Sequence, residues 1–226
     1  MDKLAPLIVI EGIDGSGKGT QSAILHQRFE QAGIRSELLS FPRYQSTFFG
    51  ARIGEFLNGK FGSLSELPPF LVSLLYAGDR FESREVIAEA RRRAQVVVLD
   101  RYVPSNIAHQ AAKADPAERE ELRKWIEHVE YNLFQLPPPE KVILLDIATW
   151  ASQELIRRKN PRSYTDRKTD LQESDVPYLE SVRQLYLTLA NLSPSWSIVS
   201  ISQNDQIRSI DEIAEDIWKQ VQHLIA

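Results

Sequence analysis

A glycine-rich loop after the first apolar run of the chain carries the residues most able to do chemistry. Gly12, Gly17 and Lys18 have the G-x-x-x-x-G-K spacing of a phosphate-binding P-loop. Glycines let backbone N–H groups turn inward around a phosphate, the helix that follows adds its positive end, and the lysine ammonium reaches the outer phosphates. The spacing therefore predicts a nucleotide-phosphate site, with an ordinary strand–helix turn as the alternative.

The loop departs from the usual pattern at one position. The Ser or Thr that normally follows the lysine, and whose hydroxyl binds Mg²⁺, is replaced by Gly19, and the hydroxyl comes one residue later, at Thr20. Successive helical residues are rotated by about 100°, so the side chain of Thr20 is expected to point elsewhere. We expect water and an acidic residue to hold the metal instead; a shifted Thr20 is the alternative.

An acidic and a basic residue directly follow another apolar run, Val96–Leu99. Asp100, at the end of a buried strand beside a P-loop, is well placed to orient Mg²⁺ directly or through water. A helix N-cap is the alternative role for Asp100. Arg101, the next residue, adds a cation that is expected at the same end of the strand, beside the P-loop.

Five short segments are predicted to be strands that position these residues. Four are almost wholly apolar, as expected for strands covered by helices on both faces, and Glu37–Phe41 is a weaker fifth. The four are Leu7–Ile10, Val96–Leu99, Val142–Leu145 and Ile198–Ile201. Strands that alternate with helices predict an α/β fold with a five-stranded parallel sheet between two helical layers. Ligands of such sheets bind beyond the carboxyl ends of the strands, where the P-loop and Asp100 lie.

Apolar residues at helical spacing predict three later helices. The first is expected to begin at Asp115 as N-cap, with a stripe that continues to Leu133. The other two stripes run from Val176 to Leu192 and from Ile207 to Leu224. No repeat or linker interrupts the chain, so residues 1–226 are predicted to form one domain.

The composition is that of an ordinary globular protein and excludes several classes. Of 226 residues, 42% are hydrophobic and 26% are charged, and the net charge is −4, which argues against a general nucleic-acid binder. The absence of cysteine excludes disulfides, thiolate chemistry and Cys-ligated metals. No apolar run has membrane-spanning length, so we expect a cytoplasmic protein without membrane partners.

Together, these motifs resemble those of the thymidylate kinases, in the family's order from near residue 7 to near residue 192. The matching residues are Glu11, Gly12, Asp14, Gly17, Lys18, Thr20 and Gln21; Phe41, Pro42, Ser46, Gly50 and Ile53; Leu74, Leu75, Tyr76, Ala77 and Arg80; Asp100, Arg101, Tyr102, Ser105, Ala108 and Gln110; and Tyr178, Leu179, Glu180, Val182 and Arg183. The stretch from Asp100 to Gln110 is the specific one, because P-loops serve many functions. The resemblance implies the P-loop NTPase fold, a homodimer, and Mg²⁺-dependent transfer of the γ-phosphoryl group of ATP to dTMP, giving dTDP and ADP.

The resemblance also implies roles for residues around the phosphates. The residues expected to hold ATP are Gly12, Gly15, Ser16, Gly17, Lys18, Gly19 and Thr20, with Arg157 packed on the adenine. Asp100 resembles a water-mediated Mg²⁺ anchor, and Arg101 resembles the arginine that bridges acceptor and donor phosphates. Asp14 corresponds to a carboxylate near the sugar 3′-hydroxyl, with a turn-forming aspartate as the alternative.

The acceptor nucleotide is expected to bind a further set of side chains. Tyr76 matches the family's stacking aromatic, and Arg80 would reach a pyrimidine carbonyl; a core role is the alternative for Tyr76. Stacking is worth about 1–3 kcal/mol for any base, so specificity must come from hydrogen bonds of Arg80 and Gln110 and from room for the methyl group. The remaining acceptor-site residues are Phe41, Arg43, Asp14, Arg101, Ser105 and His109, and Phe41 is alternatively a core residue. His109 replaces an aromatic that discourages ribose, so the resemblance does not imply strict deoxyribose preference here.

A basic segment near the C-terminal third matches the family's mobile lid, at about residues 157–170. Residues 157–168 contain six basic side chains and one acidic side chain in an acidic protein; a solvated surface loop is the alternative. Members of the family carry a catalytic arginine in the P-loop or in the lid, and Gly15 and Ser16 occupy the P-loop positions here. The resemblance therefore implies Arg162 or Arg167 as the catalytic arginine.

Two other functions fit parts of the sequence. The run Gly17-Lys18-Gly19-Thr20-Gln21 is also typical of adenylate kinases, so another nucleoside monophosphate kinase, acting on UMP, dUMP or AMP, is one alternative. A non-catalytic nucleotide-binding switch is the other. The stretch from Asp100 to Gln110 argues against the first, and the complete set of Lys18, Asp100 and Arg101 argues against the second.

Overall fold

A five-stranded parallel sheet places the P-loop at the middle of the edge formed by the carboxyl ends of its strands. The structure is a computed structural model, and it describes residues 4–62, 67–158, 175–203 and 205–225. The strands are β1 (Leu7–Glu11), β2 (Ser36–Ser40), β3 (Val96–Asp100), β4 (Lys141–Asp146) and β5 (Trp196–Ser200). Their order is β2-β3-β1-β4-β5, and every neighbouring pair is parallel. Because β1 is central, the loop after it lies between the ends of β3 and β4.

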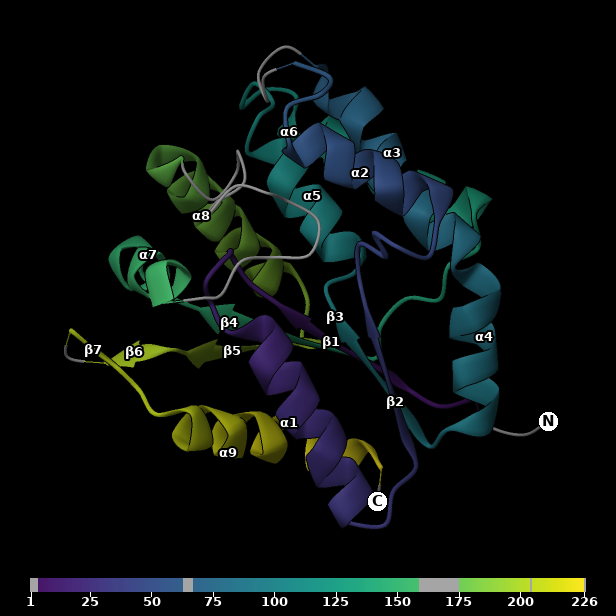
Figure 1. The fold of residues 1–226 in the computed structure, drawn as a ribbon, viewed down its shortest axis with the longest axis vertical. Coiled ribbons are helices and arrows are strands. Elements are labelled where there is room, and N and C mark those ends of the chain that lie inside the picture. Colours follow the sequence, from purple (N-terminus) through teal and green to yellow (C-terminus); the bar gives the residue numbers. More distant parts are fainter. Residues whose placement is uncertain (1–3, 63–66, 159–174, 204, 226) are drawn as a thin grey trace.

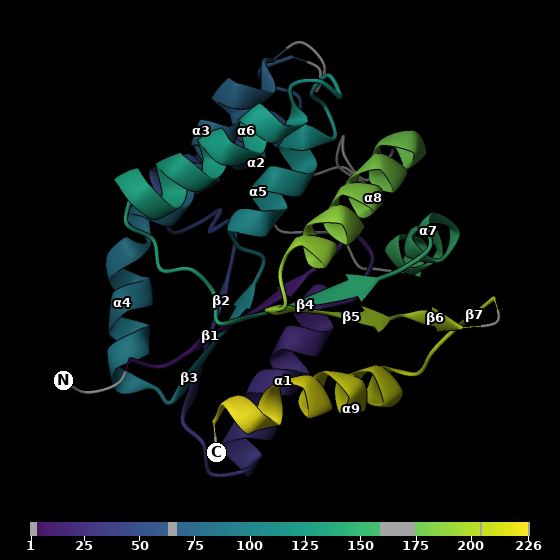
Figure 2. The same ribbon diagram turned by 180° about the vertical axis from the view of Figure 1, so that it is seen from behind.

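Helices surround this sheet (Figures 1 and 2). Their bounds are α1 (Lys18–Gln31), α2 (Phe48–Leu57), α3 (Pro69–Glu82), α4 (Arg84–Arg93), α5 (Val103–Ala111), α6 (Arg119–Glu127), a π-helical turn η1 (His128–Leu133), α7 (Thr149–Arg158), α8 (Val176–Leu192), α9 (Ile210–Val221) and a short 3₁₀ turn η2 (Gln222–Leu224). The short strands β6 (Ser202–Gln203) and β7 (Gln206–Ile207) form an antiparallel hairpin. Within the described residues, no helix combines the length and apolar character needed to cross a bilayer.

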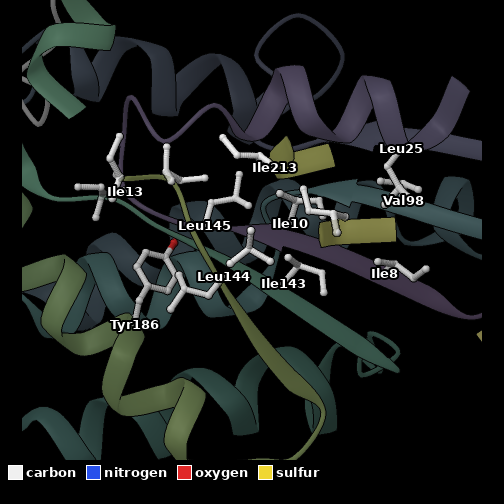
Figure 3. Packing of buried hydrophobic residues seen from close by; sticks show 14 of the residues in the cluster. Ile8, Ile10, Ile13, Leu25, Val98, Ile143, Leu144, Leu145, Tyr186 and Ile213 are labelled. Atoms are coloured by element: carbon white, nitrogen blue, oxygen red, sulfur yellow. The ribbon is translucent and has the colours of Figure 1, made fainter. Parts of the chain in front are cut away.

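Side chains of the central strands alternate between two helical layers. Ile8 and Ile10 of β1 pack in a cluster with residues of α1 and α9, including Leu25 and Ile213 (Figure 3). The intervening residues of β1 pack with α4 and α5 on the opposite face. Since successive strand residues point to opposite faces, both faces are buried, which explains the continuous apolar runs. The predicted α/β class with a five-stranded parallel sheet is confirmed.

Helices α2, α3 and α6 stand together beyond the carboxyl ends of the strands (Figures 1 and 2). A separate apolar cluster, centred on Ile53 and Phe56 of α2 and Val72 of α3, holds two of them together. Helix α3 also packs against α5, which begins three residues after the end of β3. This arrangement brings α3 and α5, which carry most of the expected acceptor-site residues, next to each other.

The predicted strand Ile198–Ile201 is corrected in position and in burial. The strand β5 spans Trp196–Ser200 and lies at the edge of the sheet. Ile198 is 45% exposed, so this segment is not covered on both faces. A short apolar run has no feature that separates an edge strand from a central one, and strand order decides the difference.

Two predicted helix starts are also wrong. Asp115 accepts a hydrogen bond from the backbone N–H of Ala117 in a turn, and α6 begins only at Arg119 and passes into η1, so Leu133 faces solvent. Ile207 belongs to β7, and α9 begins after Ser209, which forms a capping box with Glu212.

Candidate active site

The backbone of the P-loop adopts conformations that its glycines permit. The φ angles of Gly12, Gly15 and Gly17 are 145°, 80° and 85°, in the region that side chains disfavour. A Cβ atom on Gly12 would lie 2.7 Å from the carbonyl oxygen of Leu145, and one on Gly15 would lie 2.5 Å from that of Ser152. The close packing of β4 and α7 on the loop therefore leaves no room for a side chain at either position.

The loop also holds polar side chains at the N-terminus of α1. The ammonium of Lys18 is buried, and its Nζ donates to the carbonyl oxygen of Ile13 at 2.7 Å. The hydroxyl of Ser16 is buried without a hydrogen-bond partner among the described residues. Thr20 is exposed on the first turn of α1. A glycine-rich loop with an ammonium at a helix N-terminus suits a chain of phosphates.

Asp100 lies against the same helical turn. A Cβ atom on Gly19 would be 3.3 Å from Oδ2 of Asp100, so the carboxylate lies directly beside residue 19. Carboxylate oxygens are ligands that Mg²⁺ prefers, and Mg²⁺ usually keeps several waters and takes the rest of its ligands from phosphates. The residues around the P-loop therefore fit a Mg²⁺ ion held by Asp100, directly or through water.

Arg101 extends from the end of β3 to the P-loop. Its Nη2 donates to Oδ1 of Asp14, and its Nη1 donates to Oγ of Ser105 at 3.2 Å and lies 3.3 Å from Nε2 of His109. The φ angle of Arg101 is 68°, which is uncommon for a residue with a side chain. Its N–H donates to the carbonyl oxygen of Ile10, which holds the unusual conformation at the junction of the two strands.

The contacts of His109 define its protonation and its tautomer. Nε2 faces the guanidinium of Arg101, which can only donate, so Nδ1 carries the proton and donates to Oη of Tyr178 at 2.9 Å. Burial of the ring, together with the charge of Arg101, holds the pKa of His109 well below its usual value. The imidazole is therefore neutral at neutral pH and accepts from Arg101.

A buried glutamate that the sequence analysis did not assign supports Arg101 from behind. Glu11 accepts hydrogen bonds from the N–H groups of Tyr102 and Ser105 and from the hydroxyls of Ser105 and Tyr186, at 2.6–3.1 Å. Burial raises the pKa of its carboxyl group, whereas these donors favour the charged form. The hydroxyl of Ser105, expected at the acceptor, lies between Arg101 and Glu11 and links them.

The segment with Phe41 and Arg43 is anchored to α3. Phe41 is buried against Tyr102, with ring centroids 6.1 Å apart, so it takes the core role that the sequence left open. The N–H of Arg43 donates to both carboxylate oxygens of Asp79, at 3.1 and 3.3 Å, and its Nη1 donates to Oγ of Ser83 at 3.3 Å. Asp79 therefore fixes the backbone of Arg43, from which the guanidinium side chain extends.

Arg80 forms a two-pronged ion pair in the interior. Its Nε and Nη2 donate to Glu130 at 2.5 and 2.7 Å, and the two side chains are 2% and 0% exposed. Glu130 also accepts from Nδ2 of Asn106 at 2.9 Å. The sequence analysis assigned neither Glu130 nor Asn106, although Glu130 lies four residues after buried Ile126 on the α6 stripe. A carboxylate on an apolar stripe is the signal that could have identified it.

The two other acceptor residues differ in their surroundings. Tyr76 is half-buried on α3, beside the apolar cluster that α3 shares with α2. Gln110 on α5 is fully buried, and neither atom of its amide has a hydrogen-bond partner among the described residues. Buried amides normally have partners, so Gln110 is suited to bind a polar ligand group.

The structure thus brings together a large part of the predicted site but not its lid. Asp14, Lys18, Asp100, Arg101 and His109 meet where β1 and β3 end. Arg162 and Arg167 lie outside the described residues, as does most of the segment at about 157–170. Arg157 lies in the last turn of α7 as an exposed side chain, with Nη1 3.9 Å from Oε2 of Glu154.

A central parallel sheet, a P-loop between β1 and α1, and an arginine that reaches this loop from the neighbouring strand define a P-loop phosphotransferase of the kinase type. The family model for thymidylate kinase matches residues 10–216. The chain therefore belongs to the thymidylate kinase family, and the resemblance found in the sequence is confirmed.

Individual relatives agree with this membership. The chain is 32% identical over 184 residues to a thymidylate kinase of Mycobacterium tuberculosis, covering 81% of this chain and 85% of that protein. It is 33% identical over 222 residues to one from Clavibacter michiganensis, covering 97% and 95%. A solved thymidylate kinase of Candida albicans, described as having broad substrate specificity, is similar with a TM-score of 0.74 at 25% identity, covering 99% of this chain and 94% of that one.

Proposed function

We propose that this protein transfers the γ-phosphoryl group of ATP to dTMP. A phosphate oxygen of dTMP attacks the γ-phosphorus, the bond from that phosphorus to the β–γ bridging oxygen breaks, and the products are dTDP and ADP. The observation that carries the proposal is the contact of Arg101 with Asp14 beside the P-loop, in a chain of the thymidylate kinase family.

The site suits this reaction because phosphoryl transfer depends on positioning and on cations around the transferring oxygens. Lys18 and the N-terminus of α1 would hold the phosphates of ATP. Arg101 adds a cation between the P-loop and α5, where the acceptor phosphate would approach. Arg43, held by Asp79, would add a second cation for that phosphate.

Mg²⁺ is part of the proposal as the metal that accompanies ATP. Asp100 would hold it, directly or through water, at the first turn of α1. When bound, the metal neutralises charge that develops on the phosphate oxygens. The remaining cation of the proposed mechanism is a lid arginine, Arg162 or Arg167, whose guanidinium would meet the transferring group.

The acceptor base would bind between α3 and α5. Tyr76 supplies an aromatic face, Arg80 and Gln110 supply polar groups, and buried His109 lies beside Arg101. A pyrimidine monophosphate matches this combination of one aromatic wall, hydrogen-bonding groups and phosphate-binding cations.

We also propose a homodimer that works in the cytoplasm. Leu71 and Phe81 of α3 are 61% and 42% exposed, and Trp125 of α6 and Leu133 of η1 are exposed as well. Large apolar side chains gathered on adjacent elements favour a protein interface. Because the other side chains of α3 bind the acceptor in this proposal, such an interface would flank the acceptor site. Sedimentation of the purified protein as a dimer would support this interface, and a monomer at micromolar concentration would contradict it.

The activity is tested by coupled detection of ADP, with ATP, Mg²⁺ and separate reactions containing dTMP, dUMP, UMP or AMP. We expect dTMP-dependent ADP release that Lys18→Ala and Arg101→Ala abolish. A preference for UMP or AMP would replace the assigned substrate. Binding of ATP without ADP release for any acceptor would contradict the enzymatic function and favour a nucleotide-binding switch.

A further inference from the structure

Glu130 is a buried carboxylate with two kinds of partner. It is 0% exposed in the π-helical turn η1, where it accepts two hydrogen bonds from Arg80 of α3 and one from Asn106 of α5. Its carboxylate therefore joins the two elements that would enclose the acceptor base. Buried ion pairs are weak contributors to stability, because desolvation offsets most of their attraction. The burial of Glu130 is therefore better explained by a role in positioning Arg80 and Asn106 than by a contribution to the stability of the fold.

The orientation of the Asn106 amide follows from what surrounds it. Nδ2 of Asn106 donates to Glu130 at 2.9 Å and to the carbonyl oxygen of Ser73 at 3.0 Å. Both partners can only accept, so the NH₂ group must face them and the amide cannot turn over. Its Oδ1 is therefore directed away from both, and it is buried without a hydrogen-bond partner among the described residues.

A second amide on the same helix shows that a polar ligand belongs here. Gln110 lies four residues after Asn106, so the two side chains share one face of α5. Both amide atoms of fully buried Gln110 are without partners in the described part of the chain. A buried polar atom without a partner is unfavourable by about 1–3 kcal/mol, so these atoms point to a ligand that hydrogen-bonds to them.

We propose that Glu130 is a positioning residue that selects 4-oxo over 4-amino pyrimidines as acceptors, an inference that rests on the proposed function. By holding Nδ2 of Asn106, Glu130 presents Oδ1 as an acceptor for the base. By taking two N–H groups of Arg80, it directs the remaining ones of that guanidinium as donors. Thymine and uracil offer N3–H as a donor and O4 as an acceptor, which complements this pattern. Cytosine offers the reverse at both positions.

The two amides differ in what they contribute to this choice. The amide of Asn106 is fixed by two acceptors, whereas no described residue fixes the amide of Gln110. An amide that is free to turn over presents either a donor or an acceptor and tolerates both kinds of base. Discrimination between the two kinds of base must therefore come from Asn106 at N3 and from Arg80 at the 4-position, and both side chains are hydrogen-bonded to Glu130.

The test compares kcat and KM for dTMP and dCMP in the full-length wild type and in Glu130→Gln. The new amide no longer fixes Arg80 by charge, and its NH₂ group can compete as a donor, so the amide of Asn106 is held firmly only by the carbonyl oxygen of Ser73. We expect KM for dTMP to rise and the preference for dTMP over dCMP to fall by about 10- to 100-fold, the size of one or two buried hydrogen bonds. We expect kcat for dTMP to change much less, because the phosphate-binding groups are untouched.

Glu127→Gln is the matched control, since Glu127 also pairs with an arginine, Arg123, one turn earlier and outside the site. It should leave the preference unchanged. If Glu130→Gln is folded by circular dichroism and keeps the wild-type preference, or if it weakens both acceptors equally, the positioning role is wrong. If Glu130→Gln does not fold, Asn106→Ala decides the matter: it keeps the ion pair of Arg80, and an unchanged preference would overturn the proposal.

The outcomes of the wild type separate this inference from the proposed function. A wild type that phosphorylates dTMP and dCMP equally retains the proposed activity but contradicts the selection by Glu130. A wild type that phosphorylates no monophosphate contradicts the proposed function itself.

Discussion

The carboxylate of Asp100 lies against Gly19, with Oδ2 3.3 Å from the position that a Cβ atom would take there. This P-loop has no hydroxyl at the residue after Lys18, but it has a carboxylate from the neighbouring strand beside that residue. A Cβ atom at residue 19 would require Asp100 to shift by a few tenths of an ångström. The glycine and the aspartate are thus neighbours in space at the first turn of α1, although 81 positions separate them in the sequence.

From this relationship we expect Asp100→Asn to lower kcat by about 100-fold or more and to raise the Mg²⁺ concentration needed for half-maximal rate. The amide keeps the shape of the carboxylate but removes the charge that attracts the metal. Titration of activity with Mg²⁺ measures both effects. If Thr20→Ala raises the Mg²⁺ requirement and Asp100→Asn does not, the metal is held by the hydroxyl instead.

Replacement of Arg101 by lysine should lower kcat by about 100- to 1,000-fold while the protein stays folded. Lysine keeps one positive charge but cannot contact Asp14, Ser105 and His109 at the same time. Steady-state kinetics with dTMP measures the loss. Arg208→Lys, at an arginine that pairs with Asp216 away from the site, is the matched control. A turnover within a few-fold of wild type in Arg101→Lys would show that only charge matters at this position.

Acidification should destabilise the protein through His109. Burial and Arg101 depress the pKa of the folded histidine well below 6.5, the ordinary value that the unfolded chain retains. Below about pH 6.5 the unfolded state therefore binds a proton that the folded state does not, and stability is lost as the pH falls, by up to about 1.4 kcal/mol per pH unit. Urea unfolding between pH 7.5 and 5.5 should show this loss in the wild type and a smaller one in His109→Phe. Equal pH dependence in the two proteins would mean that His109 titrates normally when folded.

One arginine of the lid should be needed for the chemical step. We expect either Arg162→Ala or Arg167→Ala to lower kcat by about 10³- to 10⁵-fold, as for other arginines that stabilise phosphoryl transfer. Arg157→Ala should instead raise KM for ATP, because the role that the resemblance implies for Arg157 is to pack on adenine. Single-turnover measurements at saturating ATP separate the two effects. If both lid variants remain within a few-fold of wild type, the catalytic cation comes from elsewhere in the chain.

The sequence predicted features that depend on local chemistry. The positions of Gly12, Gly17 and Lys18 require a tight turn before a helix, and the apolar run before them requires burial on both faces, so the loop and its strand were both predictable. Element boundaries were less certain. Asp115 has the residue type of an N-cap, but its turn closes before α6 begins, and only the packing of α6 on α5 decides the start.

The support of the site could not be predicted in the same way. The positions of Glu11 and Glu130 in the sequence do not reveal their partners, yet each is fully buried and hydrogen-bonds to residues of two other elements. Whether Arg80 meets a base or another side chain likewise depends on η1 lying beside α3.

The sequence by itself determined the class of fold, the phosphate-binding loop and the family, because these follow from residue types at fixed local spacing. Only the tertiary structure decided which carboxylate holds Arg80, how the amide of Asn106 is oriented and which carboxylate lies beside residue 19. Those properties arise from contacts between segments far apart in the chain, where burial makes each donor and acceptor depend on a particular partner.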